Sequence, residues 1–366
     1  MPAAAAPPDD LAADLLAWYD AGHRALPWRD AGAAPYRTLV SEFMCQQTRV
    51  EAVLPYFARW MESFPTVEAL AAAPEDAVLE RWAGLGYYAR ARNLHATARA
   101  IAQDGFPQTV EGLRALPGVG PYIAAAVGSI AFGARAAAVD GNLERVFARV
   151  FGHPGGRAAL TPRIDACVPA GRPGDFNQAA MDLGATVCTP RAPRCAVCPL
   201  EARCAAAAAG TPTAYPAPKA KKSAPERWSL ALVVADGAGR VLLRRRPSRG
   251  LYAGLYELPT TDPAPAAPDD VAATAQAFAA ALGWGALESV GALGPAVAHT
   301  LTHMRLTVVP VVVRPGAGLV ADGPGLLWAH PAAPGAVALS TLGRKVLSAI
   351  ATPQRQMGLF GDDSDC

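Results

Sequence analysis

The sequence predicts a mainly α N-terminal domain joined by a linker to a smaller α/β domain. Residues 14–205 carry apolar positions at helical spacing. Residues 209–227 contain four prolines and three lysines with little apolar content, which is typical of an interdomain linker. Beyond the linker, short apolar runs typical of strands alternate with two helical stretches, and this mixture indicates an α/β or α+β domain.

The composition limits what the protein can be. A chain of 366 residues with 52% hydrophobic and 17% charged residues has room for two or three domains with real cores, which excludes disorder over most of its length. The net charge of +2 neither requires nor excludes a nucleic-acid partner. The N-terminus lacks the basic residues of a signal peptide, and the uncharged stretch Leu116–Ala134 is interrupted by prolines and glycines, unlike a membrane span. We expect a soluble, monomeric, cytoplasmic protein.

Each expected element follows from its own pattern. Helices of the N-terminal domain are expected at Leu39–Met61, Glu75–Trp82, Ala89–Ile101, Val110–Leu116, Tyr122–Phe132, Leu143–Phe151 and Phe176–Val187. Pro121 suits the first turn of one helix, and Asn142 is the expected N-cap of the next. The C-terminal domain is expected to have strands at Leu230–Ala235, Arg240–Arg245, Arg305–Val313 and Leu326–Ala329, and helices at Asp269–Leu282 and Thr341–Ile350.

Four of the seven cysteines lie within seventeen residues, at Cys188, Cys195, Cys198 and Cys204. In a reducing compartment such a group indicates a metal site and not disulfides. Four thiolates on a short loop suit an iron–sulfur cluster or a structural zinc ion, but the spacing Cys-x6-Cys-x2-Cys-x5-Cys fits a zinc ribbon poorly. Arg191 and Arg194 lie between the first two cysteines, where a metal-held loop would present them to phosphates; the alternative is that they are solvated charges.

The segment Leu116–Tyr122 contains Gly118 and Gly120 and predicts a tight hairpin between two helices. The backbone N–H groups of these glycines, close to a helix N-terminus, would form an anion site. This is the helix-hairpin-helix pattern, which binds a DNA phosphate without reading sequence. Other glycine-rich helix connections have a similar pattern.

Two carboxylates stand out. Glu42 lies among apolar residues, where burial would raise its pKa and let it act as a general acid. The alternative is an exposed helix glutamate paired with Arg49. Asp140 begins the sequence Asp-Gly-Asn, which is also ordinary turn chemistry.

The run Gly84–Arg92 mixes tyrosines with arginines after a glycine turn. Such a loop suits the insertion of an aromatic ring into a base stack while arginines hold phosphates. The alternative is a pair of core tyrosines beside an amphipathic helix.

In this order, these segments resemble the adenine DNA glycosylases of the MutY type, in the helix-hairpin-helix superfamily that also contains endonuclease III. The resemblance extends from Leu26 to Cys204 and continues more weakly beyond. It implies a helix-hairpin-helix glycosylase domain over residues 9–205 with an iron–sulfur cluster loop at 188–204. A linker at 209–227, a Nudix-like domain at 228–350 and a flexible tail at 351–366 would follow.

The resemblance also implies the activity. The enzyme would act in a bacterial cytoplasm, on the chromosome, and remove adenine mispaired with 8-oxoguanine or guanine after flipping it out of duplex DNA. Glu42 matches the general acid that protonates adenine N7, and Asp140 matches the carboxylate that stabilises the oxocarbenium-like sugar. The four cysteines match the ligands of one 4Fe-4S cluster.

Further positions carry over from the family. Four residues of this chain match family positions that contact the adenine or support the two carboxylates: Arg29, Tyr122, Asn142 and Gln178. Gln47 and Tyr87 match the family residues that intrude on the DNA helix around 8-oxoguanine. The sequence departs from the family at Cys45, where leucine is usual, and at Phe43, where a smaller aliphatic is usual.

Two rival functions remain. Endonuclease III, a glycosylase and lyase, carries a lysine for Schiff-base chemistry where this chain has Tyr122, so we expect no strong lyase activity. A non-catalytic damage-binding protein is disfavoured because both carboxylates are present.

Residues 228–350 resemble a Nudix-like domain, and the segment Gly250–Pro259 fits its start. Its helix lacks the glutamates that hold Mg²⁺, so we expect no pyrophosphatase activity. In the family, a Phe-Ser-His loop recognises 8-oxoguanine, and here Thr302 and His303 match its last two members; the alternative is a histidine on a solvated face. The basic run Arg244–Arg249 is expected to add phosphate contacts.

The C-terminal tail contains Gln356–Phe360, whose sequence is Gln-Met-Gly-Leu-Phe. Exposed apolar residues in a polar tail indicate binding to a groove on a partner protein. The pentapeptide resembles the motif by which bacterial repair proteins bind the sliding clamp. The alternative is that it folds back on the Nudix-like domain.

Overall fold

The computed structural model describes residues 8–29, 34–217, 223–316, 323–335 and 337–351. The chain divides into two compact units, the first formed by Met1–Ala73 with Arg90–Ala220 and the second by Pro74–Ala89 with Lys221–Cys366. None of the helices in the described ranges is both long enough and apolar enough to cross a membrane.

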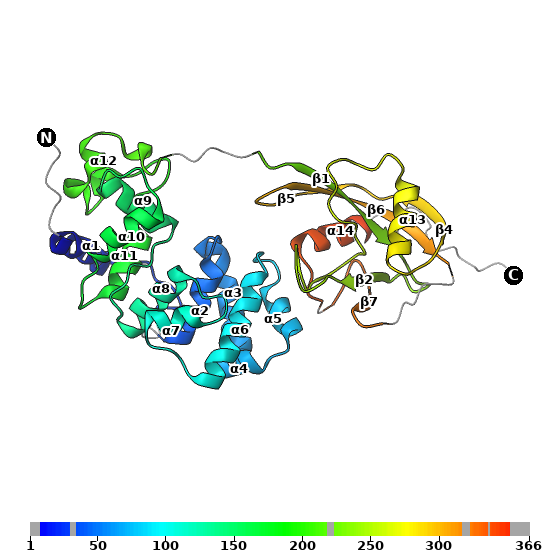
Figure 1. Ribbon diagram of the computed structural model, residues 1–366, viewed down its shortest axis with the longest axis horizontal. Coiled ribbons are helices and arrows are strands. Elements are labelled where there is room, and N and C mark those ends of the chain that lie inside the picture. The colour runs from blue at the N-terminus through cyan, green and yellow to red at the C-terminus, as the bar shows by residue number, and fades with distance from the viewer. Residues whose placement is uncertain (1–7, 30–33, 218–222, 317–322, 336, 352–366) are drawn as a thin grey trace. The chain divides into compact units, whose positions relative to one another are not determined.

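The first unit is helical, as its apolar periodicity predicts (Figure 1). Its α-helices are α1 (Pro8–Gly22), α2 (Pro35–Cys45), α3 (Val50–Ser63), α4 (Val67–Ala72), α6 (Ala89–Asp104), α7 (Val110–Ala115), α8 (Pro121–Phe132), α9 (Gly141–Val150), α10 (Arg157–Asp165), α11 (Pro173–Thr186) and α12 (Ala205–Ala208). Three short 3-10 helices follow α11: η1 (Cys195–Val197), η2 (Glu201–Arg203) and η3 (Pro212–Ala214). Helix α5 (Glu75–Trp82) belongs to the second unit.

The single helix expected at Leu39–Met61 is wrong, because two helices occupy this stretch. Helix α2 ends at Cys45 and α3 begins at Val50. Between them, Gln47 has a left-handed backbone with a φ of 54°, which cannot continue a right-handed helix. Apolar periodicity does not show this break, since no glycine or proline marks it.

Helix α9 begins at the segment that carries Asp140, and Asp140 itself is the N-cap. Its Oδ1 accepts hydrogen bonds from the backbone N–H groups of Asn142 and Leu143, both at 2.8 Å. The expectation that Asn142 is the N-cap is therefore wrong, and Asn142 lies in the first turn. An aspartate cap stabilises a helix by about 1 kcal/mol, and here it also fixes the orientation of the carboxylate.

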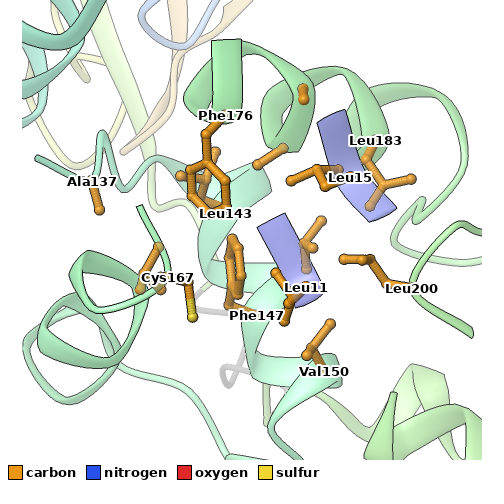
Figure 2. Close-up of a cluster of buried hydrophobic side chains, with 14 of the residues drawn as sticks. Leu11, Leu15, Ala137, Leu143, Phe147, Val150, Cys167, Phe176, Leu183 and Leu200 are labelled. Atoms are coloured by element: carbon orange, nitrogen blue, oxygen red, sulfur yellow. The ribbon is translucent and has the colours of Figure 1, made fainter. Parts of the chain in front are cut away.

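One hydrophobic core of the first unit lies where α1, α9 and α11 meet (Figure 2). Leu15 of α1, Phe147 of α9 and Phe176 of α11 are completely buried in it. The centroids of the two phenyl rings lie 5.9 Å apart. Burying one such side chain contributes about 1.5–3 kcal/mol. This core therefore holds the start of α9, and with it Asp140, at a fixed place against α11.

Among the residues that the structure describes, the second unit contains two small sheets. The first consists of β1 (Glu226–Val233), β6 (Arg305–Pro315), β4 (Leu287–Leu293) and β5 (Val297–Thr300). Strand β1 pairs with β6 in parallel, and β4 and β5 pair with β6 in antiparallel fashion. In the second sheet, β2 (Val241–Arg245) lies between β3 (Tyr256–Glu257) and β7 (Leu326–Ala329) and is antiparallel to both.

Strand β1 shows why helices cover the larger sheet. Successive side chains of a strand point to opposite faces. Leu230 and Leu232 belong to the core that contains residues of α13 (Val271–Ala281), whereas Ala231 belongs to the core that contains residues of α14 (Thr341–Ala351). Both faces of this sheet are therefore apolar and covered, which confirms the α/β class expected for the C-terminal domain.

Candidate active site

A cavity of about 750 Å³ lies within the first unit and is lined by side chains of α1, α2, α3, α8, α9 and α11. The sequence-predicted site residues that line it are Arg29, Glu42, Tyr122, Asp140, Asn142 and Gln178. Cavities of this size accommodate small organic ligands. The fold thus gathers, from far apart in the sequence, the residues expected to act on the adenine.

Glu42 lies on the buried side of α2 and is only 8% exposed, so the alternative of an exposed helix glutamate is wrong. The hydroxyl of Tyr122 donates a hydrogen bond of 2.5 Å to its Oε2. Burial and, less strongly, the charge of Asp140 raise the pKa of Glu42 to about 7, against the opposing effects of Tyr122 and Arg29. A large share of Glu42 therefore keeps its proton at neutral pH.

Asp140 faces the same cavity in a different hydrogen-bonding environment. Besides the two backbone N–H groups, the side-chain Nδ2 of Asn142 donates a hydrogen bond of 2.7 Å to Oδ2 of Asp140. Burial raises the pKa of Asp140, while the N–H donors of Leu143 and Asn142 lower it. These donors stabilise the carboxylate form, so of the two carboxyls Glu42 is the better holder of a proton.

The segment before Asp140 is braced by Asn177 of α11, which is fully buried. Its Oδ1 accepts a hydrogen bond of 2.9 Å from the N–H of Ala138, and its Nδ2 donates one of 2.8 Å to the carbonyl of Ala136. The next residue, Gln178, lines the cavity. Two adjacent residues of α11 therefore have different tasks, one structural and one at the cavity wall.

Sequence reasoning missed an ion-pair cluster that includes Arg24 and Asp182. Asp182 of α11 is buried; its carboxylate accepts bidentate hydrogen bonds from Arg29, at 2.8 and 3.1 Å, and one of 2.8 Å from Nε of Arg24. Burial acts to raise the pKa of Asp182, but the two arginines lower it overall. The available signal was the spacing, because Asp182 lies four residues after Gln178 and so shares its helix face.

The glycine hairpin joins α7 to α8, as expected. Gly118 has a φ of 73°, and a Cβ there would lie only 2.4 Å from Cβ of Asn93. Gly120 is the N-cap of α8 with an ordinary φ of −86°, and a Cβ there would meet nothing within 4 Å. Only Gly118 is thus required by the backbone and its surroundings.

The four clustered cysteines line one cavity formed by the end of α11, the loop after it and the two 3-10 helices η1 and η2; the four residues are Cys188, Cys195, Cys198 and Cys204. None of the four forms a disulfide. Within the described ranges, no three His, Cys, Asp or Glu side chains gather closely enough to hold a single metal ion.

Two arginines of α9 anchor this loop. Arg149, buried, donates hydrogen bonds from Nη1 to Sγ of Cys188 at 3.2 Å and to the Thr189 carbonyl at 2.8 Å. Arg145 donates from Nε to the Cys188 carbonyl at 2.8 Å and from Nη2 to Oδ1 of Asn142 at 2.9 Å. Because Asn142 bonds to Asp140, a continuous chain of hydrogen bonds connects the cysteine loop to the candidate active site.

The other predicted DNA contacts lie at exposed positions. Arg191 and Arg194 are exposed, and Arg194 is anchored by a hydrogen bond of 2.9 Å from Nη2 to the carbonyl of Thr186. Gln47 is exposed. Tyr87, in the second unit, is 46% exposed and, like Gln47, has a positive φ, of 48°.

Also in the second unit, Thr302 and His303 are exposed in the turn between β5 and β6. The hydroxyls of Tyr87 and Thr302 share a hydrogen bond of 2.5 Å. The phosphate contacts expected of the basic run are not supported for two of its members, because Arg245 forms an ion pair of 2.5 Å with Asp76 and Arg246 forms one with the half-buried Glu257.

Comparisons with known proteins agree with this arrangement. The family model described as HhH-GPD superfamily base excision DNA repair protein matches residues 40–162, and a NUDIX domain model matches residues 230–349. A solved structure of a thermostable thymine-DNA glycosylase is 29% identical, with a TM-score of 0.50 over 56% of this chain and 97% of that one.

Two relatives are adenine DNA glycosylases. That of Mycobacterium tuberculosis is 46% identical over 197 residues, which cover 51% of this chain and 65% of the relative. That of Homo sapiens is 35% identical over 395 residues, which cover 91% of this chain and 72% of the relative. Because this second match extends over nearly the whole chain, the chain belongs to the adenine DNA glycosylases, a family of base-excision repair enzymes.

Proposed function

We propose that this glycosylase hydrolyses the N-glycosidic bond of adenine mispaired with 8-oxoguanine or guanine in duplex DNA, which prevents G:C to T:A transversions. The observation that supports this most directly is one cavity that contains a buried Glu42, whose pKa is raised to about 7, and a carboxylate, Asp140, surrounded by N–H donors. Extrusion of the target base into such a pocket is the general solution for enzymes that act on a base.

The two carboxyl groups divide the chemistry. Glu42 gives its proton to N7 of the flipped adenine, so that the base leaves as a neutral molecule with the electrons of the glycosidic bond. Asp140, as carboxylate, stabilises the positive charge that develops on the sugar, and water completes the hydrolysis. Arg29, Tyr122, Asn142 and Gln178 line the cavity, and their proposed role there is to hold the base or to support the two carboxyl groups.

Recognition of the opposite base is assigned to exposed residues. Gln47 and Tyr87 have strained left-handed backbones, which concentrate at ligand-binding sites. Thr302 supplies a hydroxyl and His303 an imidazole for the edge of 8-oxoguanine. The hydrogen bond between Tyr87 and Thr302 supports a common role for them. The hairpin at Gly118 and Gly120, with Arg191 and Arg194, would hold the DNA backbone.

The reaction is proposed to be monofunctional. Tyr122 occupies the first turn of α8, where endonuclease III carries its Schiff-base lysine, and a phenol forms no imine. Reduction with borohydride during turnover should therefore leave no covalent enzyme–DNA product. Efficient trapping would instead identify an endonuclease III-like lyase.

We propose that the four cysteines hold one 4Fe-4S cluster. Such a cluster would hold the loop that carries Arg191 and Arg194 in a fixed conformation. Its proposed contribution is to DNA binding and not to cleavage of the N-glycosidic bond. The purified protein should be brown, and Cys198→Ser should lose the visible absorbance. Zinc without iron in the native protein would contradict this assignment.

The decisive experiment is single-turnover cleavage of duplexes that carry adenine opposite 8-oxoguanine, guanine or thymine. We expect excision opposite 8-oxoguanine and guanine but not thymine, and a loss of about 10²–10⁴-fold in Glu42→Gln, the range typical for removal of a general acid. Binding without cleavage in the unaltered protein would favour the rival, a non-catalytic damage-binding protein.

We further propose that the tail binds the bacterial sliding clamp through Gln356–Phe360, a segment outside the described residues. A tether to the clamp would keep the enzyme near newly copied DNA in the cytoplasm, where the mispair arises. A fluorescent peptide of residues 353–365 should bind a bacterial clamp with roughly micromolar affinity. An absence of binding at about 100 μM, or no loss when Leu359 and Phe360 are changed to alanine, would reject the assignment.

A further inference from the structure

The buried side chain of Arg90 on α6 forms several hydrogen bonds with the turn between α2 and α3. Arg90 is 7% exposed. Its Nη1 donates hydrogen bonds to the carbonyl oxygens of Phe43 at 3.0 Å, Met44 at 2.8 Å and Gln46 at 2.5 Å. Its Nη2 donates one of 3.1 Å to Oγ1 of Thr48.

These hydrogen bonds supply partners for the carbonyl groups at the C-terminus of α2. The last carbonyls of α2 have no partner within the helix, and a cation at a helix C-terminus is favourable. The planar guanidinium reaches several acceptors at once, which a lysine ammonium on a flexible stem does less well. The bonds of Arg90 lie on both sides of Gln47, at Gln46 before it and at Thr48 after it.

Gln47, between these two contacts, has the unfavourable conformation. Its φ of 54° is rare for a residue with a side chain, and such a backbone persists only where its surroundings fix it. Gln47 itself is exposed, while its neighbours Cys45 and Thr48 line the cavity. The turn therefore presents Gln47 beside the candidate active site.

We propose that Arg90 is a positioning residue for DNA recognition: it caps α2 and fixes the left-handed turn, so that Gln47 is already placed to enter the DNA helix. This inference rests on the proposed role of Gln47 at the mispair. Arg90 touches neither the DNA nor the adenine in this scheme. Its effect passes through the end of α2 and the turn Gln46–Thr48 that it holds.

A double-mutant cycle tests this against a purely structural role. The variants are Arg90→Met, Gln47→Ala and the two combined, as full-length holoenzyme. The affinity is measured for a duplex in which a non-cleavable 2′-fluoro-2′-deoxyadenosine lies opposite 8-oxoguanine. We expect Arg90→Met to weaken binding about tenfold when Gln47 is present and less than twofold when Gln47 is already alanine. An equal loss in both backgrounds would mean that Arg90 is only structural.

A second readout is local. A 2-aminopurine placed next to 8-oxoguanine fluoresces when the stack opens, and we expect Arg90→Met and Gln47→Ala to reduce that signal alike. Unchanged fluorescence in Arg90→Met would overturn the proposal. The matched control is Arg135→Met, since Arg135 also binds a backbone carbonyl, that of Val168, in another turn. It should leave both readouts unchanged.

A folding defect in Arg90→Met and the absence of a role for Gln47 give different results. If Arg90→Met does not fold, the same cycle is carried out with Arg90→Lys, which keeps the positive charge but not the planar guanidinium. We then expect a loss of DNA affinity of about threefold. If Gln47→Ala alone changes neither readout, Gln47 has no role at the mispair and the positioning inference fails with it. Adenine excision by the unaltered enzyme would still stand.

Discussion

At the scale of single residues, Glu42 and Asp140 show that hydrogen bonding, more than burial alone, separates two carboxyl groups. Both line the same cavity, and partial or full burial there raises the pKa of both. Asp140 receives hydrogen bonds from three N–H groups, whereas Glu42 receives one from the hydroxyl of Tyr122. Since N–H donors favour the charged form, the pair is set up as one acid and one carboxylate.

This division predicts the pH dependence of base removal. Glu42 must be protonated to act, and its pKa of about 7 means that its active form is lost as the pH rises through that value. The single-turnover rate should fall about tenfold per pH unit above pH 8. Measurement between pH 6 and pH 9 checks this. A rate that stays constant to pH 9 would contradict the assignment of Glu42 as the acid.

Tyr122→Phe should move that alkaline limb. The Tyr122 hydroxyl donates to the Glu42 carboxylate, which stabilises the charged form and lowers its pKa. Without this bond the pKa of Glu42 rises, so the rate should decline at a higher pH than in the unaltered enzyme. The comparison is the same pH series for both proteins. An alkaline limb that moves to lower pH would show that the hydrogen bond has the opposite effect.

At the scale of elements, local pattern predicts most of the helices and strands, while contacts distant in sequence decide the rest. Helix α5 begins and ends where the sequence predicts, because its periodicity and flanks suffice. The break at Gln47 was missed because it depends on Arg90, more than forty residues away. Asp182 was missed for the same reason, since its partners Arg24 and Arg29 lie over 150 residues distant.

The hairpin before α8 gives a prediction with its own control. Gly118→Ala forces a side chain into a left-handed backbone, at a cost of roughly 1–2 kcal/mol, and against Asn93. We expect a lower melting temperature and weaker DNA binding. Gly120→Ala has an allowed backbone and open space, so its melting temperature should stay within about 2 °C. Thermal unfolding of both variants, followed by DNA titration, checks this. Equal destabilisation would refute the distinction.

At the scale of the whole molecule, the proposed chemistry belongs to the first unit, whereas part of the proposed contact with the partner base belongs to the second. The cavity with Glu42 and Asp140 is complete within the first unit, and the turn with Thr302 and His303 belongs to the second. Sequence alone predicted both sets through the family resemblance. Periodicity did not predict the short strand β5, which leads into that turn. A division of this kind allows specificity to change without loss of catalysis.

The last prediction follows from that division. Thr302→Ala combined with His303→Ala removes a hydroxyl and an imidazole from an exposed turn and leaves the cavity of the first unit untouched. Because one good base contact is worth about 1–3 kcal/mol of discrimination, the preference for 8-oxoguanine over guanine should fall at least about fivefold. Adenine excision opposite guanine should stay within twofold. His330→Ala, an exposed histidine elsewhere in the second unit, is the matched control and should change neither rate. If the double variant keeps the full preference, the 8-oxoguanine contact lies elsewhere in the protein.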